Sequence, residues 1–264
     1  MLIVGERINT SRKRIRRAVE ARDAEFIQKE ARLQVEAGAS MVDVNAGTSV
    51  KDEIDDLKWL VETAQAAVDV PLCLDSPNAK AIAEALKLHK NGRPMINSIT
   101  AEKARMDEII PLVKENDTLV VALCMGESGP PSSAADRVKN ATTMKEALEA
   151  AGVPMDRAYF DPVIFPASTD GKAPMAAIEC IRTIMSQFGG AHTTCGLSNI
   201  SYGLPKRNHL NRTFLTLALA AGIDGVIVDP TEPEMMATLL AANVLLGRDE
   251  FCMNYITAER EGKL

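Results

Sequence analysis

The chain has 264 residues, of which 46% are hydrophobic and 25% charged, and its formal net charge is −6. A chain of this length can bury one large core, and about 250 residues is an ordinary size for a single α/β barrel. The acidic balance argues against a nucleic-acid partner, because phosphate binding needs a basic face and the basic cluster at residues 12–17 is short. We interpret that cluster as the solvated start of a helix.

The cysteines favour reduced thiols in the cytoplasm. Their number is odd and none forms a CxxC pair, so neither a disulfide framework nor a thiolate zinc site is indicated. We expect no secretory leader, and no apolar run reaches the ~18 residues that a membrane helix needs. The cysteines are Cys73, Cys124, Cys180, Cys195 and Cys252.

Short apolar runs alternate with longer helical patterns along the chain. Eight such units without a linker predict a single-domain (β/α)8 TIM barrel over residues 1–264, with its active site at the carboxyl ends of the strands. A doubly wound open sheet is the rival, but no GxGxxG motif follows the first strand. The predicted strands are 2–5, 41–45, 71–76, 95–98, 119–125, 158–162, 194–201 and 225–230. The predicted helices are about 23–36, 54–68, 79–88, 102–115, 135–151, 176–188, 210–221 and 234–246.

Polar side chains gather at the ends of the predicted strands. The set is rich in carboxylates and amides and contains no histidine, so neither a histidine metal ligand nor a histidine base is expected there. Two long loops, at 126–133 and 166–174, follow the fifth and sixth strands, where barrel enzymes place segments that cover a substrate. The strand-end residues are Glu6, Asn9, Asp43, Asn45, Asp75, Asn97, Asp161, Asn199 and Asp229.

These residue types predict a flat, polar, nitrogen-rich ligand. An aspartate accepts two parallel N–H bonds, as an amino-pyrimidinone edge offers, and an asparagine answers both a donor and an acceptor. Gly196, Ser198 and Asn199 leave room for a flat molecule and add donors and acceptors. The sequence therefore places a heterocycle at the barrel mouth.

Each of these residues also has a structural interpretation. Asp75 could cap the helix that follows it, and Asp161 and Asp229, each followed by proline, could begin turns. For Asp229 we favour the turn. The Asp43 to Gly47 segment could be a plain βα turn, and Arg207 could be a solvated cation or could hold the anionic end of a ligand.

Taken together, seven short motifs resemble those of the methyltetrahydrofolate:corrinoid methyltransferases, in order along nearly the whole chain. The likeness is closest to the acetogen enzyme that methylates the corrinoid iron-sulfur protein, and to relatives that return methyl groups from methyl-corrinoid proteins to tetrahydrofolate. The folate-binding module of methionine synthase looks like a more distant relative. The motifs begin at Val4 (VGERIN), Asp43 (DVNAG), Leu74 (LDS), Ile96 (INS), Asp161 (DP), Gly196 (GLSN) and Asn211 (NRTF).

The resemblance implies a pterin-binding barrel, usually a homodimer, that takes tetrahydrofolate or 5-methyltetrahydrofolate as substrate and binds no metal. It implies that Asp75, Asn97 and Asp161 hold the pterin ring, that Asn199 is the catalytic residue at N5, and that Arg207 lies near the folate. A corrinoid protein is the implied partner, since no Asp-x-His-x-x-Gly signature surrounds any histidine. Further candidates for contact with the folate are Glu6, Asn9, Asp43, Asn45 and Tyr202.

Departures from the family pattern leave the partner and the direction of transfer open. The acetogen enzyme has glutamine where this chain has Tyr202, and residues 203–206 also differ. Dihydropteroate synthase, the nearest enzymatic alternative, would need a Glu-Ser-Thr-Arg-Pro run that residues 45–49 lack. A non-catalytic folate-binding subunit is the other alternative. A free-standing methionine synthase is disfavoured, because the cysteine spacing offers no zinc site.

Overall fold

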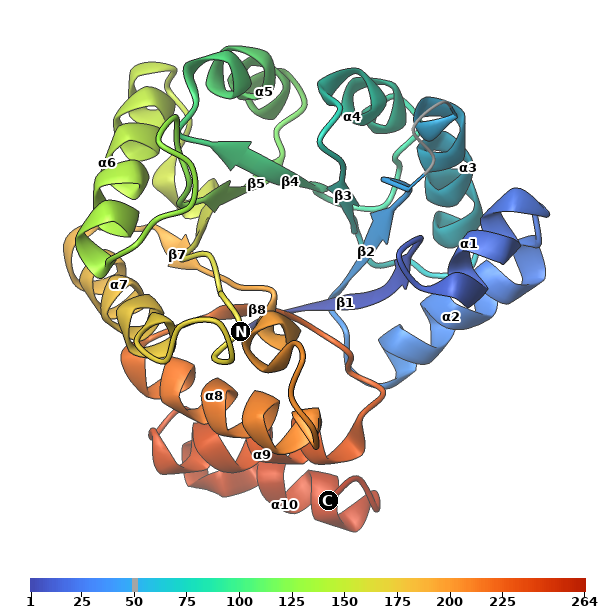
Figure 1. The fold of residues 1–264 in the computed structure, drawn as a ribbon. Coiled ribbons are helices and arrows are strands. Elements are labelled where there is room, and N and C mark those ends of the chain that lie inside the picture. The colour runs from blue at the N-terminus through green and yellow to red at the C-terminus, as the bar shows by residue number, and fades with distance from the viewer. Residues whose placement is uncertain (49–51) are drawn as a thin grey trace.

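The strands form a ring in sequence order, closed between β1 and β8 (Figure 1). All neighbouring strands pair in parallel, and between β7 and β8 a single bridge joins Gly196 to Ile227. The computed structural model describes residues 1–48 and 52–264, so Ser49 of the run compared above lies outside the described residues. The strands are β1 Leu2–Asn9, β2 Met41–Asn45, β3 Leu72–Asp75, β4 Met95–Thr100, β5 Leu119–Leu123, β6 Ala158–Asp161, β7 His192–Thr193 and β8 Gly225–Val228.

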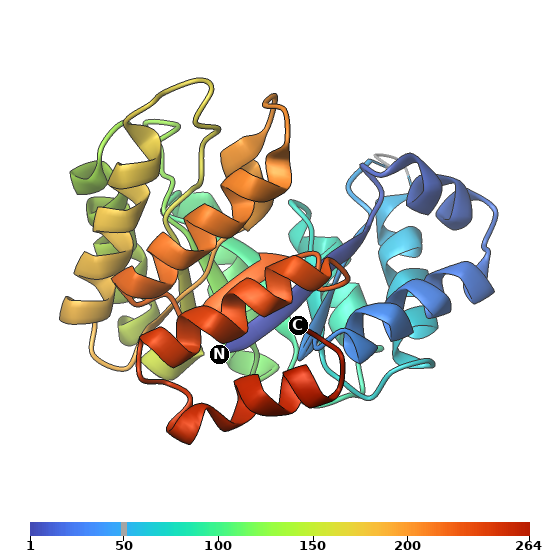
Figure 2. The ribbon, with the colours of Figure 1, turned by 90° about the horizontal axis from the view of Figure 1, so that it is seen from below.

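Helices cover the outside of this ring (Figures 1 and 2). In the described part of the chain none of them is both long and apolar enough to cross a membrane. A 3₁₀ turn, η2 (Leu197–Ser201), lies at the mouth of the barrel. The helices are α1 Lys13–Glu20, α2 Ala24–Glu36, α3 Glu53–Gln65, α4 Ala79–Leu86, α5 Lys103–Glu115, α6 Ala134–Ala150, α7 Ala173–Gln187, α8 Arg207–Ala221, α9 Pro233–Leu245 and α10 Met253–Arg260.

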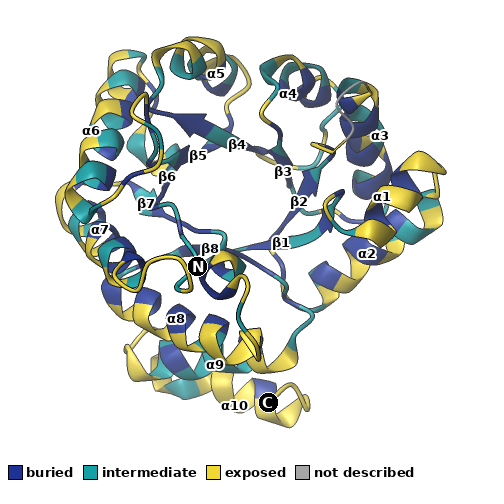
Figure 3. Cartoon of the chain, in the orientation of Figure 1, coloured by how far each residue is buried: buried dark blue, intermediate teal, exposed yellow. Residues whose placement is uncertain are grey.

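The core has an inner and an outer layer. Buried side chains fill the space between the strands and the inward faces of the helices (Figure 3). A smaller cluster packs inside the barrel near the amino ends of the strands. The members of that inner cluster are Val4, Met41, Cys73, Met95, Val121 and Ile227.

The predicted barrel is confirmed, with corrections in both halves. In the first half, β1 and β4 run on to Asn9 and Thr100, past the predicted ends at 5 and 98, and α1 was not among the predicted helices. The seventh strand is only His192–Thr193, and the polar segment that follows turns into η2 instead of extending the ladder. Its backbone bonds locally, Asn199 N–H to the carbonyl of Gly196 at 3.3 Å and Tyr202 N–H to that of Asn199 at 3.1 Å. The eighth helix begins at Arg207 and not at 210, and α10 was not predicted.

Candidate active site

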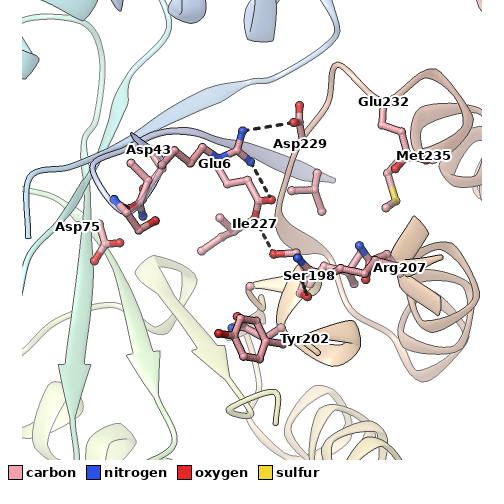
Figure 4. Close-up of a pocket in the computed structure, with 18 of the residues that line it drawn as sticks. Glu6, Asp43, Asp75, Ser198, Tyr202, Arg207, Ile227, Asp229, Glu232 and Met235 are labelled. Atoms are coloured by element: carbon pink, nitrogen blue, oxygen red, sulfur yellow. Dashed lines mark hydrogen bonds and ion pairs between the residues drawn. The ribbon is translucent and has the colours of Figure 1, made fainter. Parts of the chain in front are cut away.

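A cavity of about 920 Å³ opens at the carboxyl ends of the strands (Figure 4). Its position follows from the barrel, because parallel strands bring all their carboxyl ends to one face. The structure brings the predicted site residues together there, with the exception of Asn45. The predicted residues that line it are Glu6, Asn9, Asp43, Asp75, Asn97, Asp161, Gly196, Ser198, Asn199, Tyr202 and Arg207.

Three aspartates at the ends of β2, β3 and β6 give the cavity a carboxylate floor. Burial raises the pKa of Asp43 well above its usual range, and the charge of Asp75 adds to that effect. Burial also raises the pKa of Asp75 to about 6, with a hydrogen bond from Asn45 acting in the opposite direction. Asp161 is raised to a pKa of about 6 by burial, against the two backbone N–H groups that bond it. Asp75 and Asp161 therefore lose their protons near pH 6, below neutrality.

Asn45 supports this floor from behind. Its Nδ2 donates to Asp75 Oδ2 at 2.7 Å, while its Oδ1 accepts from the backbone N–H of Gly47 at 2.9 Å. Asn97, which does line the cavity, directs its Nδ2 to Asp43 Oδ1 at 3.5 Å. Asn45 thus orients a carboxylate, and it is not among the described residues that line the cavity.

Asp161 joins two elements of the mouth. Its Oδ1 accepts from the backbone N–H of Val163 at 2.8 Å, and its Oδ2 accepts from that of Gly196 at 3.4 Å. The first bond is the turn contact that the Asp-Pro pair suggested, and the second reaches the segment before η2. The turn and the cavity interpretations of Asp161 therefore hold together.

The turn η2 carries the exposed amide of Asn199 to the rim of the cavity. A Cβ atom on Gly196 would lie 3.2 Å from Asn199 Nδ2, so glycine leaves room for the amide to lie close over the backbone. Arg207 holds the same turn, because its Nη2 donates to the carbonyl of Ser198 at 2.7 Å and its Nε to Ser201 Oγ at 3.0 Å. Tyr202 is 68% exposed, with the Arg207 guanidinium 6.0 Å from the centre of its ring.

The opposite wall is built by β1 and its ion pairs. Ser198 Oγ donates to Glu6 Oε2 at 3.3 Å, drawn as a dashed line in Figure 4. Burial raises the pKa of Glu6, and the Arg12 guanidinium, 3.6 Å from Glu6 Oε1, opposes that rise. Asp229 Oδ1 accepts from the backbone N–H of Thr231 at 3.1 Å, the turn contact that the sequence favoured.

Asn9 also faces its own turn, since its Oδ1 accepts from the backbone N–H of Ser11 at 2.9 Å. Several lining residues were not predicted. Arg12 belongs to the basic cluster at the helix start, and Asn208 and Asn211 lie one turn apart on α8. A predicted helix that began at 207 instead of 210 would have placed Asn208 and Asn211 on one face by their helical spacing. Asp229, a predicted strand-end residue for which a turn was favoured, lines the cavity as well. The unpredicted lining residues are Ser11, Arg12, Ser98, Leu123, Leu197, Asn208, Asn211, Ile227, Val228, Thr231, Glu232, Pro233 and Met235.

Among the described residues, no group of three or more His, Cys, Asp and Glu side chains is arranged so that it could hold a metal ion. The chemistry available is that of carboxylates, amides, hydroxyls and guanidinium groups. Such a floor suits a planar molecule with several N–H donors, and the amide at the rim can reach an atom held above it.

The model of the pterin-binding enzyme family matches residues 5–229. A methylcorrinoid:tetrahydrofolate methyltransferase of Eubacterium limosum is 36% identical over 269 aligned residues, which cover 100% of this chain and 98% of that protein. The chain belongs to the methyltetrahydrofolate:corrinoid methyltransferase family of pterin-binding enzymes. The family predicted from the seven motifs is thereby confirmed.

More distant relatives agree with this assignment. The methionine synthase of Mycobacterium tuberculosis is 30% identical over 241 residues, covering 86% of this chain but only 20% of the synthase. This chain therefore corresponds to about a fifth of that protein. Dihydropteroate synthase of Xanthomonas albilineans with 4-aminobenzoic acid superposes with a TM-score of 0.67 at 20% identity, covering 93% of this chain and 91% of the other. That likeness concerns the fold.

Proposed function

We propose that this enzyme moves a methyl group between N5 of tetrahydrofolate and the cobalt of a corrinoid carried by a separate protein. The observation that carries the proposal is the cavity itself, with a buried carboxylate floor and an exposed amide at its rim. The name of the Eubacterium limosum relative supports the same reaction.

The floor would hold the pterin ring. Ionised Asp75 and Asp161 accept hydrogen bonds from the amino and ring N–H groups of an amino-pyrimidinone, and the Asn97 amide complements a neighbouring edge. Burial makes each such bond stronger than it would be in water. The residues present fit a pterin, because the acceptors lie deep in the cavity, where a neutral heterocycle with several donors satisfies them.

Asn199 would act on N5. Methyl leaves a tertiary amine poorly unless the charge that appears on nitrogen is met by a proton or a hydrogen bond. The amide N–H of Asn199 would donate such a bond during in-line displacement, while N5 takes up a proton from solvent to become the N5–H of tetrahydrofolate. In the reverse direction N5 gives that proton back to solvent, and the neutral amide does not trap the amine as a protonated, unreactive species. Because this contact strengthens as the bond breaks, it raises the rate more than the affinity.

The partner would meet the mouth of the barrel. A corrinoid supplies the cobalt that accepts or returns the methyl group, and it must come with its own carrier, because the chain contains no corrinoid-binding histidine signature. Exposed Tyr202 and the loops at 126–133 and 166–174 are the parts of this face that a large partner would contact. The differences from the acetogen pattern at residues 202–206 would then alter which corrinoid protein binds at this face.

Two further parts of the proposal concern the protein as a whole. Exposed apolar side chains on and around α9 and α10, among them Leu245 (85% exposed) and Phe251 (83%), support a homodimer. The cysteines are free and four of the five are buried, which supports a reducing compartment such as the cytoplasm.

The test is a methyl-transfer assay on the purified chain in both directions. In one direction methyltetrahydrofolate is mixed with cobalamin reduced to Co(I), and in the other tetrahydrofolate is mixed with methylcobalamin. The visible spectrum of the corrinoid reports the reaction. Parallel reactions use candidate corrinoid proteins in place of free cobalamin. We expect transfer that depends on the chain, and no stoichiometric zinc by elemental analysis. Binding of tetrahydrofolate without transfer to any reduced corrinoid would instead identify a non-catalytic folate-binding subunit. Formation of dihydropteroate from a pterin pyrophosphate and 4-aminobenzoate would identify a synthase.

A further inference from the structure

Arg105, in the first turn of α5, reaches the loop that follows β3 and the irregular middle of β4, where the register shifts between Asn97 and Ile99. Its Nη2 donates to the carbonyl of Ser76 at 2.9 Å, its Nη1 to that of Pro77 at 2.7 Å, and its Nε to that of Ser98 at 2.9 Å. One guanidinium therefore joins the loop after β3 to strand β4, which belong to different βα units.

These carbonyls lie directly after the residues that form the cavity floor. Ser76 follows Asp75 and Ser98 follows Asn97, and Asp75 and Asn97 are register partners in neighbouring strands. The backbone N–H of Ser76 also donates to the carbonyl of Asn97 at 3.1 Å. The segments around Ser76 and Asn97 are thus hydrogen-bonded to each other and also to Arg105.

Arg137 of α6 makes the same arrangement after β6. It is 1% exposed, and its Nε donates to the carbonyl of Pro162 at 2.6 Å and its Nη2 to that of Val163 at 3.3 Å. Val163 has φ of +60°, a conformation that a β-branched residue rarely adopts. Its N–H donates to Asp161 Oδ1 at 2.8 Å, so the strained residue is held at both its N–H and its carbonyl.

Resting on the proposed function, we propose that Arg105 and Arg137 are positioning residues that fix Asp75, Asn97 and Asp161 in the geometry that binds the pterin. Neither arginine is among the described residues that line the cavity. They act through the backbone that carries the three side chains. A guanidinium suits this task, because its N–H groups point in fixed directions and satisfy several carbonyls at once, which a lysine ammonium does not.

The chain offers a matched control. Arg248 also donates to backbone carbonyls, that of Leu219 at 3.0 Å and that of Ile223 at 3.5 Å, but these lie between α8 and β8, at the opposite face of the barrel. Loss of its bonds lowers stability without disturbing the cavity floor. A comparison with Arg248→Gln therefore separates a positioning role from a contribution to stability alone.

The experiment compares the parent chain with Arg105→Gln, Arg105→Lys, Arg137→Lys and Arg248→Gln. The melting temperature, the tetrahydrofolate Kd by calorimetry, and the single-turnover methyl-transfer rate are measured for each. We expect both Arg105 variants and Arg137→Lys to weaken binding about tenfold and to slow transfer by roughly 10-fold to 10²-fold, because sub-ångström errors in substrate placement are costly. Arg248→Gln should bind and react like the parent at a lowered melting temperature.

The pH dependence of binding adds a readout that a loss of stability does not move. Burial raises the pKa of Asp75, the hydrogen bond from Asn45 lowers it, the charge of Glu53 raises it, and the Arg105 cation lowers it; Asp43 also interacts with Asp75. In Arg105→Gln the acid limb of tetrahydrofolate binding should therefore move to higher pH, and Arg105→Lys should restore much of that shift while leaving the Kd raised. Asp43 and Glu53 are unchanged in both variants.

If the parent binds tetrahydrofolate and the Arg105 and Arg137 variants match Arg248→Gln in Kd, rate and pH dependence, the positioning role is overturned and the proposed function stands. Absence of tetrahydrofolate binding by the parent would overturn the proposed function and this inference with it. Because Arg105 is only partly buried, its variants keep the test open should Arg137→Lys fail to fold.

Discussion

The carboxylates of the cavity floor lower the folding stability of the ligand-free protein at neutral pH. Asp75 has a pKa of about 6 in the folded chain, above its usual value of 3.8, because burial disfavours its charged form. Between these two values the folded state keeps a proton that the unfolded state has lost. Stability contributed by that proton is fully present below the lower value and is lost as the pH rises through about 6.

Asp75→Asn should therefore stabilise the free protein at neutral pH. We expect a gain of about 1–2 kcal/mol at pH 7.5, discounted from the full shift because the residue is partly exposed, and a smaller gain at pH 5. Urea unfolding at both values measures it. If the free energy of unfolding of Asp75→Asn differed from that of the parent by the same amount at pH 7.5 and at pH 5, the proposed titration would be contradicted. Its tetrahydrofolate binding should weaken, since one acceptor is lost.

Asp161 should matter to the ligand more than to the fold. Asp161→Ala should weaken tetrahydrofolate binding by roughly 2 to 4 kcal/mol, the usual loss for a charge-assisted bidentate contact. The control is Asp249→Ala, since Asp249 is also buried and accepts from the backbone N–H groups of Asn254 and Tyr255, both at 3.0 Å, beside α10. Calorimetry that gave a folded Asp161→Ala variant the parent's Kd would refute the assignment.

Asn199 is expected to affect the rate rather than the affinity. Asn199→Ala should keep its tetrahydrofolate Kd within about tenfold and lose ~10² to 10³ in single-turnover methyl transfer, the usual cost of one preorganised donor. Asn116→Ala, an exposed amide at the far end of α5, is the control. A rate within a few-fold of the parent at saturating substrate would make Asn199 a binding or capping residue.

At the scale of elements, η2 and the start of α8 form one unit at the rim. Arg207, the first residue of α8, bonds the carbonyl of Ser198 and the hydroxyl of Ser201, and so fixes the turn that carries Asn199. The sequence suggested instead that Arg207 is either solvated or holds an anion. In the structure its bonds lie within the chain, although the residue also lines the cavity.

Arg207→Gln should loosen η2 and reduce methyl transfer about tenfold, with a smaller change in tetrahydrofolate Kd, because Asn199 would spend less time near N5. Arg212→Gln, on the next turn of the same helix and paired with Glu232 at 3.1 Å, serves as the control for a lost charge. Equal losses in the two variants would show that general electrostatics, and not the hold on η2, explains the effect.

At the scale of the whole molecule, the outer surface of α9 and α10 exposes apolar side chains that neither the core nor the cavity accounts for. Helix α10 packs on the outside of α9, away from the barrel (Figure 2), and most of its residues are exposed (Figure 3). An exposed cluster of this kind is typical of an interface between chains.

If this surface forms the proposed homodimer, Leu245→Glu combined with Phe251→Glu should shift the mass measured by light scattering from two chains to one. The double variant of a dimer should keep its tetrahydrofolate Kd, because both residues lie far from the lining of the cavity. Leu217→Glu, 46% exposed on the outside of α8, tests whether any apolar surface position has the same effect. A dimer that survives the double substitution would place the interface elsewhere.

The sequence by itself determined the barrel and most of its mouth. Buried parallel strands are apolar runs interrupted or ended by polar residues, so Asp75 at the end of β3 and Asn97 within β4 both mark the cavity. Because parallel strands share one face for their carboxyl ends, the meeting of these residues followed from the fold class alone. The motifs supplied the chemistry of the ligand.

Only the tertiary structure decided which side chains face the ligand and which support those that do. Asn45 and Asp75 are both polar strand ends, yet Asn45 turns behind Asp75 because a buried carboxylate needs a donor. Arg105 and Arg137 lie within helices and bond carbonyls of distant loops, contacts for which helical periodicity carries no signal. The shortening of β7 was equally hidden, since the segment after it has strand-like composition, while Asp161 and Arg207 hold its backbone in a turn.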